Sequence, residues 1–137
     1  MNLLIDANVL LDVLLDRKPF AEDSNLVWRV CEAGLVDGYV STLSFANIAY
    51  MMRKKLKKEQ IQNLLIQMSS IFTFVDLTFL DLKRAADLKW KDYEDAIQYV
   101  TAKKVHADGI VTRNIKDFED SQIFVSSPQE ILKILRV

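Results

Sequence analysis

The sequence predicts an α/β fold with a central parallel sheet of about five strands flanked by helices, because short apolar runs alternate with longer segments of helical periodicity. Half of the 137 residues are hydrophobic, and only three are Gly and two are Pro, a composition typical of a compact globular domain. No repeat, low-complexity tract or flexible linker divides the chain. We therefore expect one domain that spans residues 1–137.

The first expected element is a short apolar strand at residues 2–6, which ends at Asp6. Apolar residues at helical spacing follow it, so the next element is expected to be a helix. A second helix over 20–33 ends at Gly34, since glycine commonly follows the last turn of a helix. Residues 38–42 have the composition of a second strand.

Ser44 is expected to cap a helix that continues to Lys55, because a serine hydroxyl accepts a hydrogen bond from a free N–H of the first turn. The alternation then continues to the end of the chain. The remaining elements are a helix at 58–69, a strand at 71–77, a helix at 78–88, a helix opened by Asp92, strands at 109–112 and 123–125, and a helix from Pro128 to Leu135. In such sheets ligands bind at the carboxyl ends of the strands, so the polar residues there are the first candidates for a site.

Several classes of protein are excluded by the residue counts. One Cys and one His rule out Cys₂His₂ and Cys₄ zinc sites, an internal disulfide and chemistry that needs two histidines. With 18 Lys and Arg against 19 Asp and Glu, the net charge of −1 lacks the basic excess of proteins that bind duplex nucleic acid by charge alone. No apolar stretch is long enough for a membrane span, and residues 1–16 hold no Lys or Arg of a signal peptide, so we expect a cytoplasmic protein without membrane association.

Three acids and two amides lie at positions that a doubly wound sheet could bring to one edge. Carboxylate and amide oxygens suit a hard cation such as Mg²⁺, which keeps several waters and commonly also binds substrate phosphates. Such a cation could activate water for attack on a phosphate, without a His or Ser nucleophile. The five residues are Asp6, Asn47, Asp95, Asn114 and Asp117.

Three stretches of the sequence, residues 4–12, 94–96 and 110–118, resemble the PIN-domain family and, within it, the VapC-like toxin ribonucleases of the PIN_3-like subgroup. The resemblance implies a three-layer PIN-like fold and an endoribonuclease that depends on Mg²⁺ or Mn²⁺. It implies that carboxylates hold the metal and that metal-activated water cleaves single-stranded RNA to leave 5′-phosphate and 3′-hydroxyl ends. It also implies a toxin that a small antitoxin protein restrains and that forms a homodimer.

The resemblance assigns roles by position. Asp6, Asp95 and Asp117 are expected to bind the metal, and Asn47 and Asn114 are expected to complete the catalytic set. Weaker expectations place Asn8, Thr112, Arg113 and Lys116 at the substrate, although Arg113 or Lys116 could instead pair with an acid. Asp6 could simply cap the following helix; Asp92 is expected to cap the later helix, which leaves Asp95 as a ligand.

The sequence departs from the family pattern at two of these places. Asn47 stands where the family usually has Glu, and Ala7 stands where it usually has Thr or Ser. An amide offers a neutral oxygen in place of a charged one, so the affinity for a metal should be lower. The alternative function is therefore a catalytically weakened PIN-fold module that binds RNA or a protein.

An Asp at the end of a first strand also occurs in two other classes of protein. A phosphotransfer receiver and a haloacid-type phosphatase also use an Asp after the first strand, but the phosphatase needs a second Asp two residues later, where this chain has Asn8. The receiver's upstream acidic pair and late Lys are missing as well. The basic run Arg53–Lys58 is expected to be a solvated helix surface, with contact to an RNA backbone as the alternative.

Overall fold

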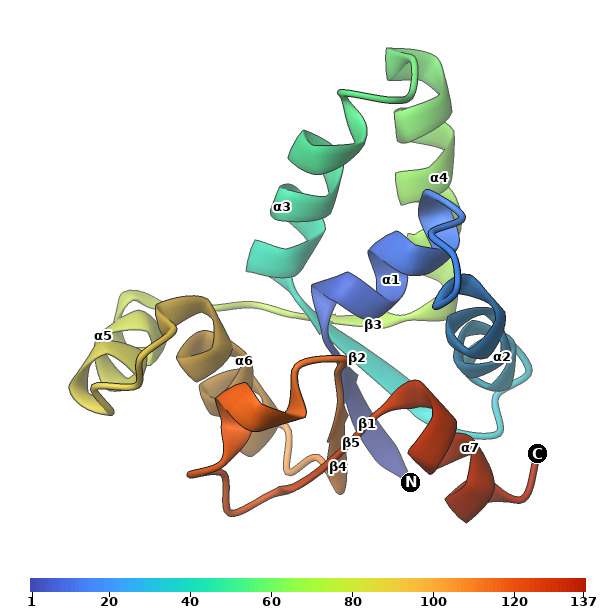
Figure 1. Cartoon of the computed structure of the whole chain (residues 1–137). Helices are drawn as coiled ribbons and strands as arrows, with labels where there is room; N and C mark the ends of the chain where they lie inside the picture. Colours follow the sequence, from blue (N-terminus) through green and yellow to red (C-terminus); the bar gives the residue numbers. More distant parts are fainter.

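A computed structural model covers residues 1–137 and confirms the predicted α/β class. Five strands form one sheet in the order β3-β2-β1-β4-β5, and every neighbouring pair is parallel (Figure 1). The strands are β1 Asn2–Ile5, β2 Asp37–Ser41, β3 Thr73–Val75, β4 Gly109–Val111 and β5 Phe124–Ser126. All five fall within or beside the strands that the sequence predicts.

Seven α-helices and one short 3₁₀ helix surround the sheet. They are α1 Ala7–Leu14, α2 Ala21–Glu32, α3 Thr42–Met52, α4 Lys58–Ile71, α5 Phe79–Asp87, α6 Tyr93–Lys104, η1 Ile115–Phe118 and α7 Pro128–Leu135. None of them combines the length and the hydrophobicity needed to cross a membrane. The last helix has the bounds that the sequence predicts, and α2 and α4 lie within two residues of the predicted ones.

Helices cover both faces of the sheet because successive side chains of a strand point to opposite faces. Leu3 and Ile5 of β1 belong to a core cluster that includes residues of α1, α2 and α7. Leu4, between them, packs on the other face with Tyr99 of α6 and Ile110 of β4. The result is a three-layer arrangement, in which residues 3–5 of β1 and the whole of β4 are apolar and buried, as expected for the inner strands of a parallel sheet.

The start of α3 differs from the prediction. Ser41, the last residue of β2, caps the helix, and its hydroxyl accepts a hydrogen bond from the Ser44 N–H at 3.1 Å. The cap must have an extended backbone outside the helix, and Ser41 has this conformation whereas Ser44 lies inside the first turn. The prediction that Ser44 is the cap was wrong, and the helix also ends at Met52 instead of Lys55.

The chain changes direction across the sheet between the neighbouring strands β1 and β4. From β1 the chain moves outward through β2 to β3, and then returns to the other side of β1 to form β4 and β5. At such a switch point the loops after the two central strands separate and leave a crevice at the carboxyl edge. The residues that follow β1 and β4, Asp6 and Thr112, flank this crevice.

A buried ion pair fixes the loop after β4 against α1. The side chain of Asp12 in α1 is fully buried, and Arg113 donates to both of its oxygens, from Nε at 2.7 Å and from Nη2 at 3.1 Å. Arg17 approaches the same carboxylate with its Nε at 3.0 Å. The Arg113 guanidinium also lies over the Phe20 ring, 3.9 Å from its centre. This two-point contact sets the position of the residues beside Arg113.

We predict that Asp12→Asn lowers the free energy of unfolding by about 3 kcal/mol, because removing one charge of a buried pair leaves the other charges uncompensated. Urea denaturation measures the change. Asp87→Asn is the matched control, since Asp87 pairs with Lys83 at 3.1 Å on the exposed surface, where such pairs contribute at most about 1 kcal/mol. Equal losses in the two variants would contradict the structural role given to Asp12.

Candidate functional site

Asp6 lies at the carboxyl end of β1 and is held by three donors. Its Oδ1 accepts the Ala7 N–H at 2.7 Å, and its Oδ2 accepts the Thr112 hydroxyl at 2.8 Å and the Asn8 amide at 3.3 Å. Asp6 is therefore the cap of α1, as one of the two interpretations of the sequence predicts. Burial nevertheless raises the pKa of its carboxyl, because the hydrogen bonds from Thr112 and Ala7 only partly offset the loss of solvent.

Asp95 lies in the first turn of α6, which starts at the same edge of the sheet because it runs back towards the beginning of β4. Asp92 caps this helix and accepts the Asp95 N–H at 3.1 Å, which confirms the predicted cap. The Oδ2 atom of Asp95 is buried and has no hydrogen-bond partner. Such an atom is costly unless a donor or a cation completes its surroundings.

The pKa of Asp95 is raised to about 7, first by burial and then by the negative charges of Asp6, Asp92, Asp117 and Glu94, in this order. The charge of Asp6 thus acts on Asp95, although the two residues are almost ninety positions apart in the chain. Buried acids whose pKa values are raised are typical of functional sites. Here, the pair lies at the crevice between β1 and β4.

The loop after β4 holds Asp6 in place. The Thr112 hydroxyl donates to Asp6 and accepts both the Asn8 amide at 3.4 Å and the Asn114 N–H at 3.0 Å. The Arg113 N–H reaches Asn8 Oδ1 at 3.3 Å. Of the four residues expected at the substrate, Asn8 and Thr112 thus support a carboxylate, and Arg113 pairs with Asp12. Lys116 is exposed and takes part in no ion pair.

The other residues predicted for the site are more exposed than Asp6 and Asp95. Asp117 is exposed on η1, and its charge contributes to the raised pKa of Asp95. Asn114 is exposed at the start of η1, and Asn47 is half-buried on α3. A hollow of about 400 Å³ is lined by the segment from Arg113 to Asp117. This hollow is open to solvent beside the acidic crevice.

Sequence reasoning missed a polar chain on the α3 side of the site. Ser41 donates to Ser44 at 3.0 Å, and the Gln98 amide also donates to the Ser44 hydroxyl. All three side chains are buried, and Gln98 Oε1 has no partner. Gln98 follows Asp95 by three residues, so the two lie on one face of α6. That spacing was the available signal, because an Asp and a Gln three residues apart share one face of a helix, and polar residues are uncommon on a face that packs in the core.

The donors at this site suit a divalent cation that keeps most of its waters. No three His, Cys, Asp or Glu side chains are grouped closely enough to form a closed metal cage. Two buried carboxylates remain, one of them with an orphaned oxygen, and Mg²⁺ is commonly bound by only one or two carboxylates together with water and phosphate. The orphaned Asp95 Oδ2 is the observation that best fits the binding of a cation.

The comparison with protein families gives an independent result. The sequence model of the PIN-domain family matches residues 2–116, which is most of the chain. The matched region includes Asp6, Asp95 and the segment after β4, but ends one residue before Asp117.

Individual relatives agree with this match. Ribonuclease VapC1 of Aquifex aeolicus (strain VF5) is 25% identical over 131 residues, which are 92% of this chain and 90% of that protein. A toxin-antitoxin complex from Klebsiella pneumoniae contains a chain with a TM-score of 0.69 and 23% identity, over 91% of this chain and 96% of that one. The structure of VapBC2 from Rickettsia felis, bound to a DNA fragment from its promoter, contains a chain with a TM-score of 0.67 and 18% identity, over 93% of this chain and 98% of that one. The chain therefore belongs to the PIN-domain family, and it is a VapC-like member.

Proposed function

We propose that this chain is a divalent-metal-dependent endoribonuclease that cleaves single-stranded RNA and acts as the toxin of a toxin-antitoxin pair. The observation that carries the proposal is the buried Asp6 and Asp95 pair, with its orphaned Asp95 oxygen. The name of the Aquifex aeolicus relative, a ribonuclease, supports RNA as the substrate. The complexes that contain the Klebsiella and Rickettsia neighbours support a small antitoxin as the partner.

The metal would be Mg²⁺ or Mn²⁺, held by Asp6 and Asp95, and Asp117 of η1 would add negative charge beside it. When bound, such an ion lowers the pKa of water and offsets the charge of a phosphodiester. Thr112 and Asn8 hold Asp6 Oδ2 from one side and so orient this carboxylate. Lys116 and the open hollow beside it offer a place for a neighbouring phosphate.

Exposed apolar residues support the predicted homodimer. Phe79 and Leu80 of α5 and Met51 of α3 expose between 44% and 80% of their surface. The dimer and the cytoplasmic location stay predictions.

We predict that stability of the metal-free protein falls as the pH rises from about 5 to 8, because folded Asp95 keeps its proton up to about pH 7 while the unfolded chain releases it near 3.8. Asp95→Asn, which stays neutral, should therefore gain about 2–3 kcal/mol relative to the wild type over this range. Urea denaturation in EDTA at the two pH values measures this gain. Parallel pH profiles for the two proteins would contradict a buried, destabilised Asp95.

We also predict that Asp6→Asn and Asp95→Asn each slow RNA cleavage at least about a hundredfold, since even the supporting residues of a metal site commonly contribute up to this factor. Asn at position 6 still caps α1, so the fold is kept. The measurement is cleavage of labelled single-stranded RNA with Mg²⁺ or Mn²⁺, with mapping of the product ends.

Asp92→Asn is the matched control, because it changes an acid to its amide in the same turn of α6 and keeps the cap. Its cleavage rate should stay within about fivefold of the wild type, the size of a helix-terminal charge effect. Cleavage that survives both site substitutions, or that is absent with every divalent metal tried, would overturn the proposal.

The second candidate function is a weakened PIN-fold module that binds RNA or protein without cleavage, and Asn47 is the residue that favours it. If the native site is active, Asn47→Glu should tighten Mn²⁺ binding, measured by calorimetry. It should change the cleavage rate by less than about tenfold, the lower end of the effect of a residue that supports the ligands of a metal site. Asn47→Gln keeps the neutral amide and is the control. Cleavage by Asn47→Glu together with an inactive wild type would instead identify the binding module.

A further inference from the structure

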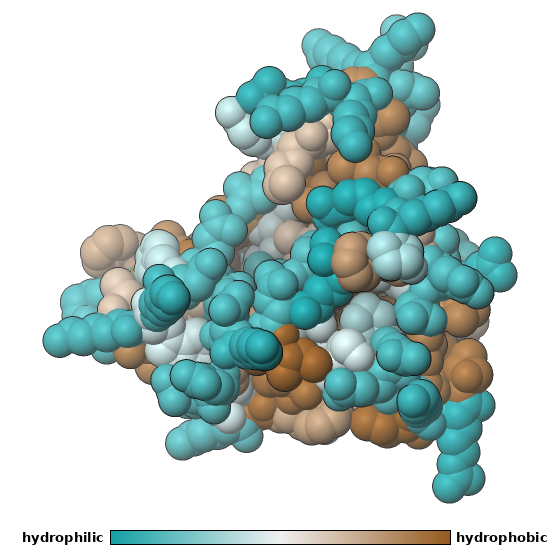
Figure 2. All heavy atoms as spheres, viewed as in Figure 1, coloured by the Kyte–Doolittle hydropathy of each residue, from teal (hydrophilic) through white to brown (hydrophobic).

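Five cations gather at the turn between α3 and α4. They are Arg53, Lys54, Lys55, Lys57 and Lys58, and every one of them is exposed. None takes part in an ion pair, whereas Lys83, Lys104, Arg17 and Arg113 elsewhere in the chain all pair with acids. We call these five residues the basic tip. Figure 2 shows hydrophilic side chains covering the end of this part of the molecule.

The basic tip makes the charge of the chain strongly uneven. Residues 42–71, which comprise α3, the turn and α4, hold these five cations and one acid, Glu59, and thus carry a net charge of +4. The other 107 residues hold the remaining 13 cations and 18 acids and carry −5. The net charge of −1 conceals this separation. A compact group of like charges, whose one neighbouring acid, Glu59, pairs with none of them, is the pattern of a surface that binds a polyanion.

The fold places the basic tip on the same side of the sheet as the acidic crevice. Helix α3 begins directly after β2, at the carboxyl edge, and leads away from the sheet. In Figure 1, α3 and α4 form an arm that projects from the body of the molecule, with the turn at its far end. Since the helix has 11 residues, it holds the turn roughly 16 Å from this edge.

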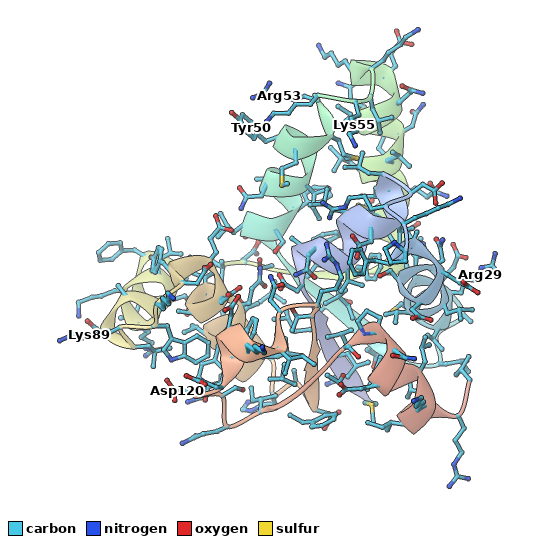
Figure 3. All side chains as sticks on the ribbon, viewed as in Figure 1. Arg29, Tyr50, Arg53, Lys55, Lys89 and Asp120 are labelled. Carbon is cyan, nitrogen blue, oxygen red and sulfur yellow. The ribbon has the colours of Figure 1, made fainter.

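An aromatic side chain lies beside the cations. The Arg53 guanidinium lies over the Tyr50 ring, 4.0 Å from its centre, and Figure 3 shows the two residues together near the end of α3. Tyr50 exposes 62% of its surface. Cations combined with an exposed aromatic ring are the elements that bind single-stranded nucleic acid without sequence preference.

We propose that the basic tip binds the phosphate backbone of the single-stranded RNA substrate, upstream or downstream of the bond that lies at the acidic crevice. This inference rests on the proposed function for its choice of RNA. A separation of roughly 16 Å corresponds to about five nucleotides of a stacked strand, one phosphate every 3.4 Å. The contact raises affinity for RNA that is long enough to reach the tip and leaves the chemistry at Asp6 and Asp95 unchanged.

The test uses the full-length triple variant Lys54→Gln, Lys55→Gln and Lys57→Gln. The matched control is Arg29→Gln, Lys133→Gln and Arg136→Gln, which removes the same charge from exposed residues of α2 and the end of α7. Binding of a labelled RNA of about 20 nucleotides is followed by fluorescence anisotropy in EDTA over a range of salt. Because no metal is present, this measurement does not depend on cleavage.

The tip variant should lose up to about fiftyfold in affinity at 0.15 M salt, and the slope of log affinity against log salt should fall by about 2, since each phosphate contact contributes about 0.7 to the slope. A loss no greater than that of the control would overturn the proposal. An unchanged RNA affinity would do so too and would leave an acidic protein segment as the partner of the tip.

A second measurement tests the position of the contact. For cleavage of the 20-nucleotide RNA, the tip variant should raise KM and leave kcat unchanged, whereas RNA of about four nucleotides, too short to span the distance, should be cleaved equally by both proteins. An equal defect on the short RNA would contradict the position. If the wild type binds RNA through the tip but cleaves nothing, the proposed function fails while the tip remains an RNA-binding surface.

Discussion

The crowding of two buried carboxylates at one edge of the sheet is the constraint on which this structure depends. Burial opposes the ionisation of both Asp6 and Asp95, and the charge of Asp6 adds to it at Asp95, whose pKa is raised to about 7. This arrangement lowers the stability of the fold, because burying a charge without a partner costs free energy. A divalent cation removes the cost, so the unfavourable site of the free protein becomes a favourable one when the ion is bound.

The rest of the fold can be understood as support for this pair. The switch in strand order opens the crevice between β1 and β4. Across this crevice, the hydroxyl of Thr112, which follows β4, donates a hydrogen bond to Asp6, which follows β1. Asp12 and Arg113 fasten the loop that carries Thr112 to α1. Helix α6 brings in Asp95 because it begins at the same edge. The positive arm lies beyond this edge, so opposite charges are separated along the path that a bound strand would follow.

Much of the fold was predictable from the sequence, because apolar periodicity and strand-end polarity are local signals. The cap Asp92 also depends only on neighbouring backbone, but Ser44 was misplaced because two serines three residues apart offer the same signal. The Asp12 and Arg113 pair was not predictable, since its partners are 101 residues apart. For the same reason, the sequence identified Asn8 and Thr112 as site residues without showing that they hold Asp6.

The most direct test of the metal site is to diffuse Mn²⁺ into crystals of the protein and to locate it by anomalous scattering. We predict one strong anomalous peak at the crevice between β1 and β4. The Mn²⁺ ion at this peak should have Asp6 and the orphaned Asp95 Oδ2 among its ligands and water in most remaining positions. The peak should disappear in Asp95→Asn crystals. Mn²⁺ bound elsewhere, or no peak beside a protonated Asp95, would contradict the account.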